Sequence, residues 1–454
     1  MHEKLTAESP ISTSAPATTV RWRIVALLMA AAFLCLFNRM SFTVAGAEQL
    51  MKEFDLSTLQ MGRVYSSYLF IYALAMIPGG WLIDRYGAKF ALAAMGVGAG
   101  VCVMLTGVVG LLALPAMVMT SLMVIRGLTG LFSVPMFPAS ARTISAWLPP
   151  NNRALANGLV TAAALLGAAG TFYIFGALMD RFGWKQAFMI SGLITLTVTA
   201  AWIFYARSSP AEHRGVNAAE LRLIASHSDS GWAPNSIVTQ PPTSPPRWHL
   251  LLFNRSLMLL TVSYGLAGYV QYVFFHWTQY YFSEVLKVGP KESRFYAMLP
   301  NVAMAVGMFA GGWIADDLCR RIGPRWGRAG MAVAGLLAGA AFLYCGMIAE
   351  NPNWIVTWFS LGLGAVGMAE GPYWVTAIEL GGRQGGASGA IFNTGGNLGG
   401  MIAPVATAWL SEHYDWDVAL WATSLACIAA AILWMFIQPG EQTRSLSANA
   451  GASG

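Results

Sequence analysis

Long apolar runs recur along almost the whole chain and alternate with short polar segments. Each run is about 20 residues or longer, and at about 1.5 Å per residue a helix of that length crosses a hydrocarbon core of roughly 30 Å. The runs are too long and too continuously apolar for the strands of a membrane barrel. The pattern therefore predicts twelve transmembrane helices, at residues 24–47, 64–83, 90–113, 116–141, 154–178, 186–205, 257–282, 295–315, 329–348, 354–378, 386–410 and 418–437.

One polar segment is much longer than the others and divides the twelve predicted helices into six and six. Residues 206–253 are rich in Pro, Ser, His and charged side chains, and we interpret them as a cytoplasmic linker. The sequence therefore predicts an N-terminal six-helix bundle at 21–205 and a C-terminal six-helix bundle at 254–437. The polar ends, 1–20 and 438–454, are expected to be cytoplasmic tails, the first of them disordered.

The two predicted bundles share a repeat in their loops. GGWLID at 79–84 follows the second helix, and GGWIAD at 311–316 follows the eighth, 232 residues later. Trp184 and Trp416, after the fifth and eleventh helices, are also 232 residues apart. Two landmarks at one offset indicate duplicated halves. Within the first half, LIDRYG recurs as LMDRFG on the opposite side of the membrane. We therefore interpret each half as two inverted three-helix units. This layout is typical of secondary transporters.

Composition and charge place these helices in a membrane and orient them. Of the 454 residues, 56% are hydrophobic and only 11% are charged, whereas ordinary soluble domains have about 25% charged residues. If the N-terminus is cytoplasmic, eighteen of the 27 basic residues lie on the cytoplasmic side. The positive-inside rule then predicts a multi-pass protein of the plasma (inner) membrane with both termini in the cytoplasm, and the net charge of +6 requires no nucleic-acid partner.

Three segments carry a resemblance to a known family. GGWLIDRYGAK (79–89) resembles the loop signature Gly-x-x-x-Asp-Arg-x-Gly-x-Lys of the major facilitator superfamily. RGLTGLFSVPMFPASARTISAWLPPNNRALANG (126–158) and GASGAIFNTGGNLGGMIAPV (386–405) are similar to the fourth and eleventh helix regions of its anion:cation symporter family. That family includes bacterial carriers of sugar acids and related carboxylates, and the animal vesicular glutamate and sialic-acid carriers. The resemblance implies an all-α membrane fold of twelve helices in two pseudo-symmetric six-helix halves.

Two arginines lie deep within predicted helices, Arg39 in LCLFNRMSF and Arg126 in VIRGLTG. A charge at a helix centre costs about 2.5–3.5 kcal/mol on insertion scales, so each should face a cavity, a partner or a ligand. Neutralisation by buried carboxylates is the simpler interpretation, but in the N-terminal half Glu48, Asp84 and Asp180 all lie at helix ends. An unpaired buried cation attracts an anion, so we expect an anion-binding site. The resemblance implies that arginines at these two places are associated with the substrate anion and with the coupling network.

The residues beside these arginines depart from the family pattern. Many members have Asp-Arg where this chain has Asn38-Arg39, and a glutamate where it has Ser133, and those carboxylates are the family's usual candidates for proton coupling. Neither Asn nor Ser titrates, so coupling must use other groups, use another ion or be absent. Glu370 and His276 are the titratable alternatives. A role of Glu370 as the structural partner of an arginine is an equally good interpretation. For His276, the preferred interpretation is an ordinary hydrogen-bonded histidine in the core or at an interface.

Further polar and aromatic residues complete the predicted substrate site. The resemblance implies substrate contacts from Tyr72, Tyr373, Trp374 and Asn393, and polarity alone adds Gln271 and Gln279 in the seventh helix. Their hydroxyl and amide groups suit a hydroxylated anion, whereas an apolar acid would stack on an indole ring.

Two features predict how such a site opens and closes. Four prolines are expected to bend their helices because each removes a helix hydrogen bond; they are Pro135, Pro138, Pro372 and Pro404. Charged residues on the cytoplasmic side are placed to form a salt-bridged latch that stabilises the outward-open state, unless they serve only as an orientation signal. These residues are Asp84, Arg85, Lys89, Arg142, Asp316 and Arg320.

The sequence thus predicts a monomeric secondary carrier in the lipid bilayer that moves a small organic anion, a sugar acid or related carboxylate, by alternating access. Coupling to a proton or to another ion stays open, and an uncoupled uniporter or a transporter-like anion receptor is the alternative. The five cysteines form no CxxC pair, and the sequence contains no P-loop or nucleophile elbow. Neither an enzyme, a cofactor nor a metal site is therefore expected.

Overall fold

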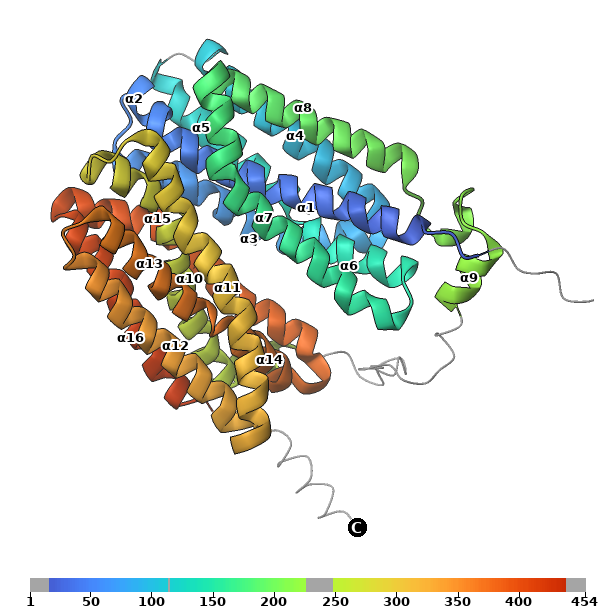
Figure 1. Cartoon of the computed structure of the whole chain (residues 1–454). Helices are drawn as coiled ribbons and strands as arrows, with labels where there is room; N and C mark the ends of the chain where they lie inside the picture. Colours follow the sequence, from blue (N-terminus) through green and yellow to red (C-terminus); the bar gives the residue numbers. More distant parts are fainter. Residues whose placement is uncertain (1–15, 113–114, 226–247, 438–454) are drawn as a thin grey trace, which may run out of the picture.

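In the computed structural model, which describes residues 16–112, 115–225 and 248–437, the chain forms two bundles of helices that lie side by side (Figure 1). Within those ranges no strand occurs. The predicted all-α class is therefore confirmed. The remaining parts of the predicted tails and linker, 1–15, 226–247 and 438–454, lie outside the described residues.

The N-terminal bundle contains the first six predicted apolar runs. Its elements are α1 (Val20–Ala45) with its extensions η1 (Gly46–Leu50) and α2 (Met51–Glu53), then α3 (Thr58–Tyr86), α4 (Ala88–Leu112), α5 (Pro115–Ser133), α6 (Met136–Trp147), α7 (Pro150–Phe182) and α8 (Trp184–Tyr205). The linker then adds η2 (Pro210–Glu212), α9 (Ala218–Ala225) and η3 (Trp248–Phe253).

The C-terminal bundle contains the other six runs. Its elements are α10 (Arg255–Tyr280) with its extension η4 (Tyr281–Val285), then α11 (Pro290–Ile322), α12 (Pro324–Met347), α13 (Pro352–Gly367), α14 (Glu370–Gly381), η5 (Gly382–Gln384), α15 (Gly385–His413) and α16 (Trp416–Met435). Each of the twelve predicted runs coincides with one helix or with a pair of consecutive helices.

Length and apolar composition confirm that most of these helices suit a membrane. Nine helices of the described residues are long and apolar enough to cross one, and α3 makes a tenth if its two parts, bent by 52°, count as one span. The two remaining predicted spans form the interrupted pair α13–α14 and the 29-residue, glycine-rich α15.

Helix ends follow the repeat seen in the sequence. Gly87, Gly183 and Gly323 end α3, α7 and α11 with φ of +83°, +81° and +87°, a conformation that favours glycine because it has no Cβ. Gly87 and Gly183 are the glycines of the two Asp-Arg-x-Gly loops, and Gly323 is the glycine of their counterpart in the second half. The two halves also have helix breaks at corresponding places. Val134–Pro135 separates α5 from α6 in the first half, and Met368–Ala369 separates α13 from α14 in the second.

The linker helix α9 is held against the start of α1. Glu220, which is fully buried, accepts hydrogen bonds from the backbone amides of Val20 and Arg21 and forms an ion pair of 2.9 Å with the Arg21 guanidinium. A carboxylate at a helix N-terminus pairs with free amides and with the positive end of the helix dipole. This contact fixes the first described part of the linker to the N-terminal bundle.

The two bundles meet along three helix pairs, α1–α10, α3–α15 and α7–α11. We call the end of the molecule where α1 and α7 finish the Glu48 end, and the end where α3 finishes the Asp84 end. Contacts between the bundles run from the Glu48 end to the middle of the molecule, where they include the candidate site.

Candidate functional site

The structure brings the two predicted arginines together in the centre of the molecule. Arg126 on α5 is 2% exposed, and its Nη2 lies 3.4 Å from the carbonyl oxygen of Arg39 on α1. The Tyr68 ring lies against both guanidinium groups, with its centroid 4.8 Å from Cζ of Arg39 and 4.9 Å from Cζ of Arg126. Cation–π contacts of this kind partly offset the cost of burying two like charges close together.

Neither arginine has an acidic partner within the described parts of the chain. No ion pair among the described residues includes Arg39 or Arg126. The Nε atom of each is buried without a hydrogen-bond partner in that part of the chain. Since a guanidinium carries five N–H donors, most of the donors of this pair make no hydrogen bond to the described residues.

Arg39 lies at the contact between the two halves. Nη2 of Arg39 donates a 2.6 Å hydrogen bond to the hydroxyl of Tyr272, and Oγ1 of Thr43 lies 3.1 Å from Nδ1 of His276. Both pairs join α1 to α10 and are separated by 233 residues, one more than the sequence repeat. Residues that are equivalent under a two-fold relation can touch only near its axis, so the site lies between the halves.

His276 lies in the interface between the halves, close to the arginines. It is 2% exposed and stacks on Tyr65 of α3, with ring centroids 4.7 Å apart. The Tyr272 ring also stacks on it, with centroids 6.0 Å apart. The His276 ring thus packs among residues of α1, α3 and α10.

Glu370 lies away from the arginines, at the break that begins α14. Its Oε1 accepts hydrogen bonds of 2.8 Å from the Tyr264 hydroxyl and from the Trp374 indole N–H. No basic side chain of the described residues forms an ion pair with it. The interpretation of Glu370 as the ion-pair partner of a central arginine is therefore wrong for this conformation.

The other predicted substrate-binding residues do not all lie beside the arginines. Tyr72 stacks on Tyr68 beside the arginines, with centroids 6.1 Å apart. Asn393 lies one turn from Asn397, which contacts Met76 of α3, so the same face of α15 is directed at the other half. Gln271 precedes Tyr272 on α10 and is partly buried.

Tyr373 and Gln279 lie outside the arginine site. Tyr373 is 1% exposed inside the C-terminal bundle, where its hydroxyl lies 2.6 Å from Oγ of Ser263 and its ring packs against Trp434. Gln279 donates from Nε2 to Glu48 at the Glu48 end. In this conformation the structure places both residues away from the arginines.

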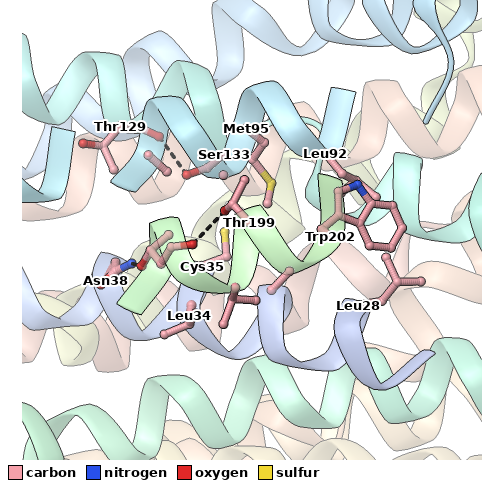
Figure 2. A pocket seen from close by; sticks show the side chains of 15 residues that line it. Leu28, Leu34, Cys35, Asn38, Leu92, Met95, Thr129, Ser133, Thr199 and Trp202 are labelled. Carbon is pink, nitrogen blue, oxygen red and sulfur yellow. Dashed lines mark hydrogen bonds between the residues drawn. The ribbon is translucent and has the colours of Figure 1, made fainter. Parts of the chain in front are cut away.

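Asn38 and Ser133, the positions where the family has acids, line a small cavity inside the N-terminal bundle. Asn38 comes from α1 and Ser133 from α5, and Cys35 of α1 also lines the cavity (Figure 2). The cavity volume is about 30 Å³, enough for one or two water molecules. Nδ2 of Asn38 donates to Oγ1 of Thr195 at 2.8 Å, and Oγ of Ser133 donates to the Thr129 carbonyl at 2.7 Å. Neutral hydrogen bonds therefore satisfy both side chains.

The Glu48 end is closed by ion pairs that the sequence did not predict. Arg294 on α11, 6% exposed, bonds through Nε to Oε1 of Glu48 at 2.6 Å and through Nη1 to Oδ2 of Asp180 at 2.7 Å. Nearby, Lys52 pairs with Glu284 at 2.6 Å. Each of these pairs joins one half to the other.

A carboxylate on α15 adds a further link at the same end. Oε1 of Glu412 accepts from the Thr58 hydroxyl at 2.6 Å and from the Leu59 amide at 2.8 Å, at the first turn of α3. An acidic group is favourable there because the helix N-terminus has free N–H groups. The start of α3 is thus tied to the end of α15.

At the Asp84 end the predicted latch residues bond within their own halves. Nη1 of Arg142 pairs with Oδ1 of Asp84 at 2.9 Å, and Arg320 pairs with Asp317 at 3.3 Å. Arg85 lies over the Trp81 and Tyr86 rings. The Lys89 carbonyl accepts from Trp202, and no ion pair of the described residues involves Asp316. No ion pair between the halves occurs at this end within the described ranges.

Comparison with known sequences identifies the family. The profile of the Major Facilitator Superfamily matches residues 28–391, with a second match at 318–453. This chain belongs to the major facilitator superfamily. The first match alone covers more than half of the chain, so the predicted family is confirmed, and with it a multi-pass membrane transporter rather than an enzyme.

Similar superfamily members from bacteria carry names of organic-anion transporters. The chain is 27% identical to a probable sulfoacetate transporter of Cupriavidus necator, over 92% of this chain and 94% of that protein. It is 25% identical to a D-galactonate transporter of Escherichia coli, over 94% and 97%. A probable galactarate/D-glucarate transporter of the same species is 26% identical, over 87% of each chain.

Solved structures of the superfamily share the fold. A bacterial homologue of the human lysosomal transporter Spinster, in an inward-facing and occupied conformation, has a TM-score of 0.74 at 15% identity, covering 93% of this chain and 97% of that one. A D-xylose–proton symporter has a TM-score of 0.70 at 16% identity, covering 92% and 99%. The predicted major facilitator fold is therefore confirmed.

Proposed function

We propose that this superfamily member is a secondary transporter that binds a small organic anion at Arg39 and Arg126 and carries it across the membrane by alternating access. The observation that carries the proposal is the pair of central guanidinium groups without acidic partners among the described residues. Tyr72 and Asn393 are proposed to contact the rest of the substrate.

The cost of burying the arginines supports an anionic ligand. One charge at mid-membrane costs about 2.5–3.5 kcal/mol on insertion scales. Arg39 obtains only one hydrogen bond and two ring contacts from the described residues, and Arg126 obtains a long hydrogen bond and two ring contacts. A carboxylate or sulfonate offers each guanidinium the bidentate, charge-assisted hydrogen bonds that these neighbours do not supply.

The contacts between the halves support alternating access. Ion pairs close the Glu48 end, whereas at the Asp84 end the ion pairs of the described residues stay within one half. With the orientation predicted by the basic residues, the Asp84 end is cytoplasmic and this conformation is inward-facing. The latch proposed for Asp84, Arg142 and Asp316 would form in the opposite, outward-open state.

The substrate class follows from the polar groups beside the arginines and from the names of the relatives. Sulfoacetate, galactonate and glucarate are each small anions, and the last two carry several hydroxyl groups. Tyr68, Tyr72 and Asn393 offer hydroxyl and amide groups for such a substrate. We therefore propose a sugar acid or a related carboxylate or sulfonate as the substrate.

Binding assays with purified protein test the anion site. Galactonate, glucarate and sulfoacetate should raise the thermal unfolding temperature of the wild type, because a ligand that binds the folded state stabilises it. Galactitol, which lacks the charge, should not. Arg39→Ala and Arg126→Ala should each abolish the shift, whereas Arg23→Ala, an exposed arginine at the start of α1, should retain it. Shifts that persist in both central variants would refute the site.

Counterflow in proteoliposomes separates a transporter from a receptor. Liposomes preloaded with the unlabelled anion should accumulate labelled anion transiently if the protein exchanges substrate. A receptor would bind the same anion with no exchange. An imposed proton gradient then separates a symporter from a uniporter, since only a coupled carrier accumulates substrate against its gradient.

A further inference from the structure

A large groove lies at the Glu48 end between the two halves, distinct from the central site. Its volume is about 740 Å³, and it is formed by the end of α7 and the start of α11. Both walls carry exposed apolar side chains: Tyr173 of α7 is 78% exposed and Phe295 of α11 is 52% exposed, and Met298 of α11 also lines the groove. An exposed apolar surface of this kind on a transmembrane helix pair faces lipid.

The mouth of the groove carries two basic side chains that form no ion pair among the described residues, although Lys291 is close enough to Asp180 to attract it electrostatically. Arg181 and Lys291 line the groove together with Arg294 and Asp180. Arg294 is occupied by Glu48 and Asp180, but no ion pair among the described residues includes Arg181 or Lys291. Both of these side chains are exposed. The groove therefore keeps an excess of positive charge at one end.

The order of charged and apolar residues along the groove is that of a membrane interface. Arg181 is the last residue but one of α7, and Lys291 is the second residue of α11. Tyr173 lies eight residues before Arg181 on the same helix, which is about 12 Å deeper at 1.5 Å per residue. Cations thus lie at the level of the headgroups, and the aromatic wall lies at the level of the acyl chains.

From this complementarity we propose that the groove binds an anionic phospholipid from the leaflet at the Glu48 end. Its phosphate lies between Arg181 and Lys291, and an acyl chain lies along Tyr173 and Phe295. One wall belongs to each half, and Arg294 holds the walls together through Asp180. The lipid therefore binds the conformation that is closed at the Glu48 end and stabilises it. The site is separate from the proposed anion site and does not depend on it.

Native mass spectrometry of delipidated protein titrated with phosphatidylglycerol or with phosphatidylcholine tests the proposal. The wild type should retain phosphatidylglycerol in preference, and Arg181→Gln/Lys291→Gln should lower its retention at least fivefold. Arg63→Gln, an exposed arginine near the start of α3 outside the groove, is the matched control and should retain the lipid as the wild type does. Tyr173→Glu, which places a negative charge on the apolar wall, should also lower retention.

Three results would overturn the proposal. They are equal retention of the two lipids by the wild type, unchanged retention in the double variant, and displacement of the lipid by soluble glycerol phosphate, which would indicate a site for a free phosphate instead. The thermal unfolding temperature without lipid should be equal in the double variant and in Arg63→Gln, because both affect only exposed side chains. This check ensures that lost retention reports the site rather than the fold.

Discussion

Glu370 is the carboxyl of the C-terminal bundle best placed to communicate with the central arginines. It accepts from the Tyr264 hydroxyl, and Tyr272, two turns further along α10, accepts from Arg39. One helix thus joins the carboxyl to the arginine over about 12 Å. A coupling group must titrate, and its protonation must change the balance of conformations. Since Asn38 and Ser133 are neutral, we propose that Glu370 takes this role.

Glu370→Gln should separate coupling from transport. The amide oxygen keeps an acceptor for Tyr264 and Trp374, so the helix break should stay intact, but the side chain can no longer bind and release a proton. We expect the counterflow rate to stay within about twofold of that of the wild type. Under a proton gradient, the substrate should reach only equal concentrations on the two sides of the membrane and should not accumulate. Glu379→Gln, on the same helix and paired with Arg328 on the surface, is the control. Accumulation that survives in Glu370→Gln would exclude the coupling role.

Single residues differ in how well the sequence predicts their place. The importance of Arg39 and Arg126 was predictable because a charge deep in a membrane helix is costly whichever way the side chain points. Tyr373 and Gln279 were not, because helices with apolar residues on all sides do not reveal which face is directed at the central axis. Arg294 was missed because its partner Glu48 lies 246 residues away, and no sequence pattern relates the two.

Among the helices, continuous apolar runs predicted position and length, but the irregularities were harder to predict. The breaks before Pro135 and near Pro372 lie where proline removes a helix hydrogen bond. Pro404 lies inside an unbroken α15, while α3, for which no bend was predicted, is bent by 52° next to Pro78. Proline therefore marks possible bends, and the neighbouring helices decide which of them form.

The close contact of α3 with α15 gives a prediction for the conformational equilibrium. A Cβ added at Gly62 would lie 2.6 Å from the Pro404 carbonyl oxygen, whereas at Gly80, on the same helix, it would meet no atom within 4 Å. Overpacking costs about 1–3 kcal/mol, so Gly62→Ala should shift the equilibrium roughly 5- to 150-fold toward the state that is open at the Glu48 end. Alanine favours a helix over glycine, so α3 itself should not unfold.

Spin labels attached to α6 and α14 in a cysteine-free variant report this shift. Both helices lie at the Asp84 end, so closing of that end shortens the distance between the two labels. Gly80→Ala should leave the distance distribution unchanged. If Gly62→Ala also leaves it unchanged, the contact between α3 and α15 does not control the equilibrium.

In the whole molecule, the ends of the two bundles are held in different ways. Arg294, Lys52 and Glu412 link the halves at the Glu48 end, and Tyr272 and His276 link them at the centre. The sequence predicted both halves, because the repeat is visible in the loops. It did not predict which end is closed, because a transporter sequence must support both states and pattern alone favours neither.

Arg294→Gln should therefore open the Glu48 end. Removing the guanidinium leaves the Glu48 carboxylate, whose side chain is 9% exposed, without a cation. Breaking a buried ion pair by removing one partner costs about 3–5 kcal/mol, although Asp180, at 42% exposed, recovers part of this by hydration. We expect at least a tenfold shift toward the state open at the Glu48 end, measured with the same spin labels, and no shift in Arg63→Gln. Because Glu48→Gln/Arg294→Gln leaves no unpaired charge at Glu48, it should shift the equilibrium less than Arg294→Gln alone. An equal or larger shift in the double variant would mean that Arg294 closes this end by packing rather than by its charge.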